Sequence, residues 1–331
     1  MILVQEALLR CFPVDELVMI ERLELGPFSR GWLAQVKQSG QSQRWFVKQH
    51  RRKQKARLEF ELQLQELLSR QGLDVIPAVI PTRSGMLWFA CDDEYFSVHP
   101  FIDADPPSDW MKNAPLSTEK LHLAGAELAQ FHDGCRRAQN ALPASWQNQA
   151  RPWLPQLQNS LNEALSKAEQ RLPADDPIGK LAATGGQKIR RNLASCLAKL
   201  QSEQHERILI HGDYHPGNVL WRLGRIVAVL DFDYVQLGWP GYDVAYAAYM
   251  FGRDFQSPGI PHAGALSSFS EGYGIDPAAI DAFKLLPPVL VGYWLLEEYV
   301  EQPQLRETIF TALQTSLQDA VNLIGAGETA C

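Results

Sequence analysis

The hydrophobic periodicity of the sequence changes near Pro100, and this change limits the chain to a fold with two structurally different parts. From about Met19 to Phe101, short β-rich runs alternate with turn residues. In the later sequence, long segments dominate in which apolar residues recur every three or four positions. We therefore predict an α+β fold, with a sheet-based part over residues 1–100 and a mainly helical part over residues 101–331.

Six short runs in the first part are predicted to form a small, largely antiparallel sheet. They are 18–25, 32–37, 45–50, 75–80, 87–91 and 95–98. Their separators are rich in Gly, Asp and Ser, which favour turns. A helix is predicted over 55–70, because Phe60, Leu64 and Leu68 share one helical face and Gly72 follows as a stop signal.

The second part contains one β-rich island within helical sequence. Helices are predicted around 121–131 and 189–200, and residues 141–176 are interpreted as a helix-rich insertion. The island consists of runs 208–210 and 226–230, joined by a polar loop that contains Gly and Pro. Because this loop interrupts an otherwise helical region, it is the first place to look for a functional site.

Composition and charge exclude several classes of protein. The 331 residues include 38 Asp and Glu against 31 Lys and Arg, a net charge of −7, which argues against nucleic acid as a partner. The longest apolar run, 285–296, contains two prolines and is too short to cross a membrane. The N-terminus has no secretory signal pattern. The five cysteines include no C-x-x-C pair, so we expect reduced cysteines and a cytoplasmic protein.

The polar loop carries the strongest indication of function. Asp213 precedes Asn218 by five residues, and Asp231 ends the next β-rich run. Oxygen-bearing side chains of this kind suit Mg²⁺, which proteins usually hold with one or two carboxylates and substrate phosphates. Phosphoryl transfer needs such a metal and a separate carboxylate that accepts or orients the proton of the attacking hydroxyl. Each residue alone could be an ordinary turn or cap residue, but their order favours a phosphotransfer site.

Motifs around this loop resemble those of the aminoglycoside phosphotransferase and choline kinase superfamily. The motifs are His211-Gly212-Asp213 with Asn218, Leu230-Asp231-Phe232-Asp233, Gly238 to Pro240, and Tyr242-Asp243-Val244-Ala245. The resemblance covers about Met19 to Ala248. It implies a two-lobed, protein-kinase-like fold, with residues 1–100 as an ATP-binding N-lobe and residues 101–331 as a C-lobe that holds the catalytic loop and the substrate pocket. It also implies ATP and Mg²⁺ as cofactors.

The resemblance assigns a role to each matching position. It implies that Asp213 is the catalytic base and that Asn218 and Asp231 are Mg²⁺ ligands. Asp243 is expected to brace the catalytic loop from the following helix. Apart from the resemblance, His211 is expected to orient the loop, because the alternative, a metal site formed by His211, Asp213 and His215, is less favoured. Both would therefore act through other residues.

The first part of the chain also has residues for an ATP-binding lobe. Lys48 lies on the third β-rich run, and Glu61 lies on the helix that follows. On that helix, Glu61 is at the edge of the apolar face, where a carboxylate needs a cation. We predict that a Lys48–Glu61 pair holds the lysine against the ATP phosphates. Glu59 is the competing choice.

Two further nucleotide contacts are predicted. The loop 26–31 has two glycines but matches neither G-x-G-x-x-G nor a Walker A loop, because Trp32 and Leu33 replace the phosphate-binding Lys and Ser/Thr. Backbone N–H groups near Ser29 are still expected to cover the phosphates. The lobe junction, residues 97–101, is expected to contact an adenine edge, with His99 as the candidate residue, although it could be an ordinary strand exit.

Two competing interpretations are less favoured. His211, Asp213 and His215 alternate as in some metal sites, but the glycines and proline of the loop make a straight strand unfavourable there. The basic run 50–57 would suit nucleic acid or an acidic partner, but such a run is more often a solvated face.

The acceptor site is predicted from two groups of residues, each of which could equally belong to the core or the surface. They are Asp233, Tyr234 and Trp239, which follow Asp231, and Trp294, Glu297 and Glu298, which recur at helical spacing. An aromatic and acidic surface of the second kind binds amines through cation–π and ionic contacts.

These observations predict an ATP- and Mg²⁺-dependent phosphotransferase that moves the γ-phosphoryl group to a hydroxyl of a small molecule of the aminoglycoside, choline or homoserine type. One alternative is a protein Ser/Thr kinase of the bacterial stress-response type, which the loop 211–221 resembles. Another is a kinase-fold binding protein without turnover. The presence of Lys48, Asp213, Asn218 and Asp231 argues against this last alternative.

Overall fold

The chain forms two compact units. The computed structural model describes residues 2–23, 30–50, 54–106, 109, 111–112, 115–139, 146, 156–203, 205–257 and 264–328. Unit 1 comprises Met1–Asp105, Arg137–Gln149 and Leu220–Asp233, and unit 2 comprises Pro106–Arg136, Ala150–Val219 and Tyr234–Cys331. Residues 1–100 thus fall in unit 1, but the stretch Leu220–Asp233, predicted with the second part, also belongs to unit 1.

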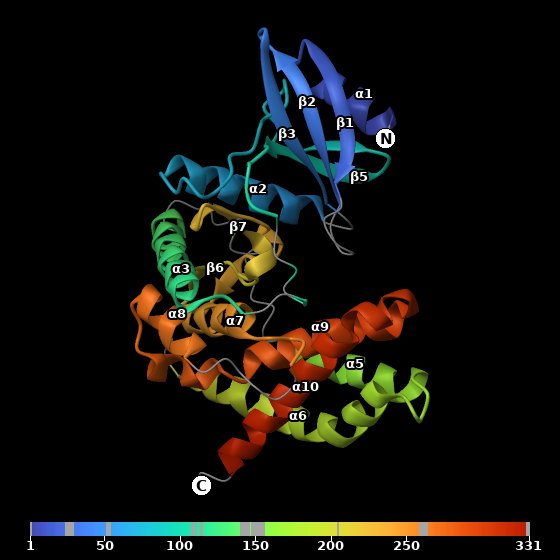
Figure 1. The fold of residues 1–331 in the computed structure, drawn as a ribbon, viewed down its shortest axis with the longest axis vertical. Coiled ribbons are helices and arrows are strands. Elements are labelled where there is room, and N and C mark those ends of the chain that lie inside the picture. The colour runs from blue at the N-terminus through green and yellow to red at the C-terminus, as the bar shows by residue number, and fades with distance from the viewer. Residues whose placement is uncertain are drawn as a thin grey trace. The chain divides into compact units, whose positions relative to one another are not determined.

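Unit 1 is built on a five-stranded antiparallel sheet (Figure 1). In chain order the strands are β1 (Glu16–Leu23), β2 (Gly31–Gln38), β3 (Gln41–His50), β4 (Phe89–Cys91) and β5 (Glu94–Pro100), and their order in the sheet is β1-β2-β3-β5-β4. β2 and β3 are joined by Ser39 and Gly40, both with positive φ, as expected for a tight hairpin turn.

The two faces of this sheet differ because side chains alternate along each strand. On β3, Trp45 and Val47 are buried against an N-terminal helix, α1 (Ile2–Cys11), which the sequence patterns did not predict. Lys48 lies on the opposite face of the strand. Helix α2 (Lys55–Arg70) has the bounds predicted for it. The sheet therefore buries an apolar face and keeps polar side chains for the other.

The predicted strand at 75–80 is wrong. These residues form turns and irregular backbone, and only Ile80 donates a backbone hydrogen bond to β5, at Val98 O over 2.8 Å. Pro77 and Pro81 flank this bond and have no N–H, so a continuous ladder cannot form. Residues 24–29, which include the loop around Ser29, lie outside the described residues.

A hairpin formed by β7 (Val219–Arg222) and β8 (Arg225–Val229) accounts for the late stretch in unit 1. The N–H of Val229 donates to Val75 O over 2.8 Å, and the N–H of Asp105 donates to Trp221 O over 2.7 Å. These bonds tie the hairpin, and the Asp231 that follows it, to unit 1.

Unit 2 consists mainly of helices, together with a short antiparallel strand pair (Figure 1). The strands are β6 (Ile208–Ile210) and β9 (Gln236–Gly238). The helices are α3 (Thr118–Gln139), α5 (Leu157–Arg171), α6 (Pro177–Ser202), α7 (Pro240–Gly252), α8 (Ala265–Tyr273), α9 (Leu286–Glu301) and α10 (Arg306–Glu328). Short 3₁₀ turns cover 216–218, 232–234, 277–283 and 303–305.

Two of the helices, α3 and α6, begin at a polar cap residue. The N–H of Lys120 donates to Ser117 Oγ at the start of α3. At the start of α6, Asp176 Oδ1 accepts from the N–H groups of Ile178 and Gly179 over 2.8 and 3.0 Å. Helix α5 lies within the predicted insertion, 141–176, and α6 begins directly after it.

Among the residues that the structure describes, one apolar helical stretch, Pro277–Glu301, is long enough to cross a membrane by length and composition. It is longer than the run predicted at 285–296, because the turn 277–283 leads directly into α9. More than half of its most apolar window, 56%, is buried inside the protein. A buried core helix has the same composition, so this stretch is weak evidence for a membrane span.

Candidate active site

In unit 1, Lys48 holds two carboxylates of the segment that follows β8. Its Nζ lies 2.9 Å from Asp231 Oδ1 and 3.2 Å from Asp233 Oδ1. Asp231 has a positive φ of 66°, an unusual backbone conformation for a residue other than glycine. The backbone therefore turns away from the direction of β8 at Asp231. Unusual backbone geometry of this kind is frequent at functional sites.

Charge and burial oppose each other in this cluster. Burial lowers the pKa of Lys48, but the negative charges of Asp231, Asp233 and Glu61 raise it above its ordinary value, so the ammonium stays charged. Burial and the neighbouring Asp233 raise the pKa of Asp231, while Lys48 opposes that rise. A bound cation would relieve the repulsion between the two carboxylates.

Glu61 is buried on α2, with 3% of its surface exposed, whereas the competing Glu59 is more exposed and lies near Lys55. The Nε of Arg57 donates to Glu61 Oε1 over 2.7 Å, and Nη2 of the same guanidinium donates to Asp233 O over 3.0 Å. Glu61 acts on Lys48 through its charge, and the Lys48–Glu61 pair stays a prediction. Arg57, which the sequence patterns did not single out, links α2 to the segment that carries Asp231.

His99 belongs to a chain of hydrogen bonds on the polar side of the sheet. Its Nε2 lies 2.8 Å from Ser97 Oγ, which in turn lies 2.8 Å from His50 Nε2, and its Nδ1 lies 3.2 Å from Ala78 O. Burial, together with the charge of Lys48, lowers the pKa of His99 to about 4, so the imidazole is neutral at pH 7. The imidazole thus makes its hydrogen bonds within unit 1. An adenine contact through residues 97–101 stays a prediction.

In unit 2, the loop 211–218, which we call the Asp213 loop, begins directly after β6. Gly212 has a φ of 78°, and a Cβ on it would lie 2.4 Å from Tyr234 O. Both the backbone conformation and the close approach therefore require glycine at this position. The loop ends in the 3₁₀ turn at 216–218, where the N–H of Gly217 donates to His215 Nδ1 over 3.0 Å.

Asp213 is surrounded by donors. The hydroxyl of Tyr246 donates to its Oδ1 over 2.7 Å, and Nδ2 of Asn218 donates to its backbone O over 2.9 Å and to its Oδ2 over 3.2 Å. Nε2 of His215 lies 3.6 Å from Oδ2. Burial alone would raise the pKa of Asp213, but His215, Tyr246 and His211 together lower it below its ordinary value. The carboxylate is therefore ionised at neutral pH and able to orient or accept a proton.

Asp243 fixes the start of the Asp213 loop. Its Oδ2 accepts from the N–H of His211 over 2.8 Å, and its Oδ1 accepts from the N–H of Gly212 over 2.9 Å. The carboxylate is fully buried, as is the imidazole of His132, whose Nε2 lies 3.0 Å from Oδ2. This is the position expected of a residue that braces the loop.

The His-Asp-His alternation does not form a metal cluster. The buried ring of His211 packs against Phe131 and Tyr214, with centroids 5.6 and 5.7 Å away. Among the residues that the structure describes, no group of three or more His, Cys, Asp or Glu is arranged to hold a metal ion. A site built from several imidazole or thiolate ligands is therefore not supported.

The donor chemistry fits Mg²⁺ better. Both hydrogen bonds that the Asn218 side chain makes to Asp213 use Nδ2. The side-chain oxygen of Asn218, Oδ1, can therefore serve as a metal ligand. Asp231 supplies carboxylate oxygens in a cluster with a second carboxylate. Mg²⁺ is usually bound by a few protein oxygen ligands, and phosphates and water supply its remaining ligands.

The predicted acceptor residues differ in their surroundings. Trp239 is 4% exposed and packs in the core of unit 2, 5.9 Å from Phe283 between ring centroids, so it does not line an open pocket. Tyr234 is exposed, and Asp233 contacts Lys48.

The acceptor residues on α9 share one half-buried face of that helix. Trp294, Glu297 and Glu298 are all half-buried, and the hydroxyl of Tyr293 donates to Glu297 Oε2 over 2.8 Å. Burial raises the pKa of Glu298. The face thus combines aromatic and acidic groups, and its binding role stays a prediction.

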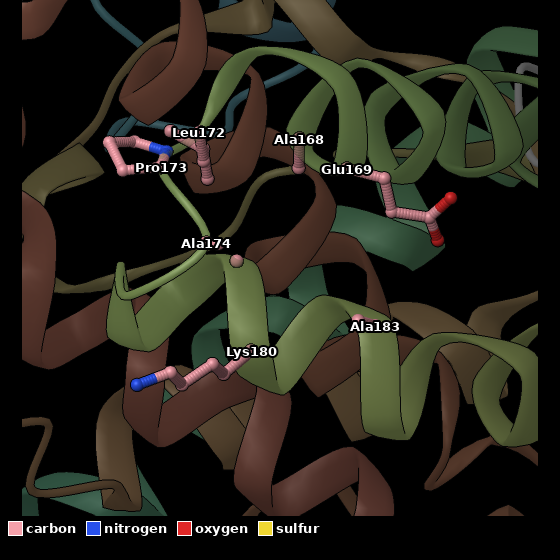
Figure 2. Close-up of a pocket in the computed structure, with 8 residues that line it drawn as sticks. Ala168, Glu169, Leu172, Pro173, Ala174, Lys180 and Ala183 are labelled. Atoms are coloured by element: carbon pink, nitrogen blue, oxygen red, sulfur yellow. The ribbon is translucent and has the colours of Figure 1, made fainter.

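A separate cavity of about 180 Å³ lies where α5 turns into α6 (Figure 2). Its lining is apolar apart from Glu169 and Lys180, whose charged ends point away from each other in Figure 2. None of the predicted site residues lines it.

Sequence signals existed for two of the residues that were missed. Tyr246 lies three positions after Asp243 on α7, and Arg57 lies four positions before Glu61 on α2, so each shares a helical face with a residue that was predicted. His132 lies on a different helix, far away in sequence, and no local pattern points to its contact with Asp243.

Together, the antiparallel sheet of unit 1, the helices of unit 2 and the loop with its carboxylate and amide are those of a phosphotransferase with a protein-kinase-like fold. Residues 24–283 match the phosphotransferase enzyme family, so the chain belongs to that family. No curated protein matches the sequence.

Solved structures show the same fold along nearly the whole chain. A spectinomycin phosphotransferase in complex with ADP and spectinomycin is 20% identical, with a TM-score of 0.66 over 98% of this chain and 97% of that one. An amicoumacin kinase in complex with AMP-PNP and Ca²⁺ is 17% identical, with a TM-score of 0.66 over 97% and 92% of the two chains. A choline kinase from Cryptosporidium parvum is 15% identical, with a TM-score of 0.62 over 98% and 96%.

Proposed function

We propose that this phosphotransferase moves the γ-phosphoryl group of ATP, with Mg²⁺, to a hydroxyl of a small molecule. The surroundings of Asp213 carry the proposal. This carboxylate is ionised, lies on a loop that Asp243 holds by two backbone N–H groups, and is hydrogen-bonded to the amide that would bind metal. A hydroxyl needs such a group to orient it and to take its proton during transfer.

Each cluster has its own part in the proposed reaction. In unit 1, the Lys48 ammonium would bind phosphate oxygens, and Asp231 would bind Mg²⁺ once Lys48 shifts part of its contact to the nucleotide. In unit 2, Asn218 would bind Mg²⁺ through Oδ1, and Asp213 would hold the acceptor hydroxyl. The metal would neutralise charge that develops on the phosphate oxygens. A cytoplasmic location, where MgATP is abundant, belongs to the same proposal.

A small alcohol with an amine is the acceptor that we favour. The face of α9 with Trp294, Glu297 and Glu298 offers an aromatic ring and carboxylates, which recognise ammonium groups. The solved spectinomycin and choline kinases are named for small molecules of this chemical type. A protein acceptor, the alternative from the sequence, is an outcome of the acceptor screen described below.

The nucleotide site is tested by calorimetric titration of ATP with and without Mg²⁺. The wild type is expected to bind more tightly with Mg²⁺, and Asp231→Ala is expected to lose that difference. Asp103→Ala, which removes an exposed aspartate of the same unit, is the control and should retain it. Equal binding by wild type and Asp231→Ala in both conditions would remove Asp231 from the metal site.

The transfer itself is tested by ADP release with spectinomycin, kanamycin, choline and casein as separate acceptors. Asp213→Asn is expected to lower kcat by about 10²–10⁴-fold. Asp133→Asn, an exposed aspartate of unit 2, should leave kcat unchanged. Phosphate found only on casein would favour the protein-kinase alternative, and wild-type turnover retained by Asp213→Asn would refute the proposed base.

A further inference from the structure

We infer that His132 and Tyr273 position the Asp213 loop through Asp243, as a relay of hydrogen bonds that runs from α8 through α3 to α7. The inference rests on the proposed function for its meaning in catalysis, but its structural part can be tested separately. Neither residue touches the reacting groups, so both are positioning residues.

The relay starts from a carboxylate whose oxygens are all in use. Asp243 accepts three hydrogen bonds, from the N–H groups of His211 and Gly212 and from Nε2 of His132, while fully buried. Because a carboxylate can only accept, the hydrogen between the two side chains must lie on His132 Nε2. If His132 lost this bond, the carboxylate would be free to rotate away from the two loop amides.

Tyr273 then selects the form of His132 that can donate to Asp243. Its hydroxyl lies 2.7 Å from His132 Nδ1, the ring nitrogen on the other side. In a neutral imidazole that carries its hydrogen on Nε2, Nδ1 is an acceptor, so the tyrosine hydroxyl donates to it. Burial raises the pKa of Tyr273 to about 12, despite the opposing charge and hydrogen bond of Arg136, so the hydroxyl keeps its hydrogen.

The packing of α3 against α8 supports this relay independently. A Cβ on Gly125 of α3 would lie 2.1 Å from Phe269 O, and a Cβ on Gly272 of α8 would lie 2.0 Å from His122 O. Each helix thus places a glycine against the backbone of the other. No other residue permits this close approach, which brings Tyr273, next to Gly272, within hydrogen-bond distance of His132.

The relay therefore connects helix packing to the site. The two glycines allow α3 and α8 to approach closely, so that Tyr273 can hydrogen-bond to His132. His132 in turn hydrogen-bonds to Asp243, which accepts from the backbone N–H groups of His211 and Gly212 just before Asp213. A displacement of about 1 Å at a reacting group can cost about 10²-fold in rate, so a group that only holds the loop can still control kcat.

Four variants of the full-length chain test the inference. His132→Leu removes both hydrogen bonds, and His132→Gln keeps an N–H near the position of Nε2. Tyr273→Phe removes the hydroxyl alone. Tyr249→Phe is the matched control, because Tyr249 is also half-buried but its hydroxyl donates to Asp319 instead. Amide hydrogen exchange of His211 and Gly212 reports the loop directly, without any need for activity.

The expected results separate positioning from general damage. His132→Leu should raise the exchange rate of the two amides by about 10- to 100-fold, which corresponds to a lost buried hydrogen bond. It should also lower kcat for ADP release from MgATP while the KM for ATP stays within twofold. His132→Gln should restore most of both properties, Tyr273→Phe should give an intermediate loss, and Tyr249→Phe should match the wild type.

Three results would overturn the inference. The first is wild-type exchange of the two amides in His132→Leu. The second is a His132→Gln variant as defective as His132→Leu, since the shape of the ring would then matter rather than its N–H. The third is an imidazole ¹⁵N spectrum of the wild type in which His132 Nδ1 carries the hydrogen, a measurement that decides the question even if the leucine variant does not fold. A wild type that releases no ADP but shows the expected exchange pattern would refute the proposed function and retain the relay.

Discussion

Replacement of Gly212 by Ala should damage both stability and turnover, and the structure separates two causes. The residue has a φ of 78°, where an L-residue costs about 1–2 kcal/mol. The new Cβ would also meet Tyr234 O at 2.4 Å, and forcing an additional carbon into a packed site costs about 1–3 kcal/mol. The expected loss in free energy of unfolding is therefore about 2–5 kcal/mol.

Gly274→Ala is a control that isolates the second cause. Gly274 lies in the same unit with a φ of 83°, but among the described residues nothing lies within 4 Å of its Cβ position. It should lose only the backbone component, about 1–2 kcal/mol. The difference between the two variants then measures the contact with Tyr234.

Urea unfolding of both variants, followed by tryptophan fluorescence and compared at unchanged m-value, gives the two losses. Gly212→Ala should in addition lower kcat by about 10²-fold. The N–H of Gly212 donates to Asp243, and Gly212 directly precedes Asp213, so a shift of Gly212 displaces the Asp213 carboxylate. If the two alanine variants lose the same stability, the close approach to Tyr234 does not constrain the loop and the reasoning fails.

Three further predictions concern other parts of the chain. Lys48→Met should weaken ATP binding by about 10- to 100-fold in calorimetry, since it removes a charged donor and leaves Asp231 without its ammonium partner. Because the pKa of His99 falls from 6.5 to about 4 on folding, the unfolded chain binds more protons between these values, so stability falls as pH drops through this window; His99→Gln should remove about 3 kcal/mol of that fall. Arg253→Met should cost about 3–5 kcal/mol in urea unfolding, because Asp319 would keep a buried charge without its partner.

Matched variants check these three predictions. Lys37→Met changes an exposed lysine of unit 1 and should leave ATP binding intact. His122→Gln changes an exposed histidine and should keep the wild-type dependence of stability on pH. Replacing both Arg253 and Asp319 by apolar residues should recover part of the loss. Equal effects in a variant and its control would contradict the corresponding prediction.

Local patterns in the sequence were sufficient for much of the fold. The bounds of α2 followed from the spacing of Phe60, Leu64 and Leu68 and from Gly72, because helix formation depends on residues within one or two turns. The change from strands to helices near Pro100 followed from periodicity for the same reason. The prediction of a strand at 75–80 was wrong, because it relied on apolar composition, whereas a strand also needs backbone N–H donors and Pro77 has none.

The identity of the chemical groups was also readable from the chain. The order of Asp213, Asn218 and Asp231 predicts a base and two oxygen ligands, since chemical capacity belongs to the side chain itself. The distances around them were not readable. That Lys48 contacts Asp231 and Asp233 depends on the path of the chain after β8, including the positive φ of Asp231.

Tertiary structure alone decided what holds these groups in place. Tyr246 on α7 donates directly to Asp213, whereas His132 on α3 contacts Asp243, which holds the loop. The glycines Gly125 and Gly272 permit the close approach of α3 to α8. Such contacts join residues far apart in sequence, and only packing of whole elements brings them together. The sequence therefore determined which chemistry the chain can perform, whereas long-range packing determined which side chains orient it.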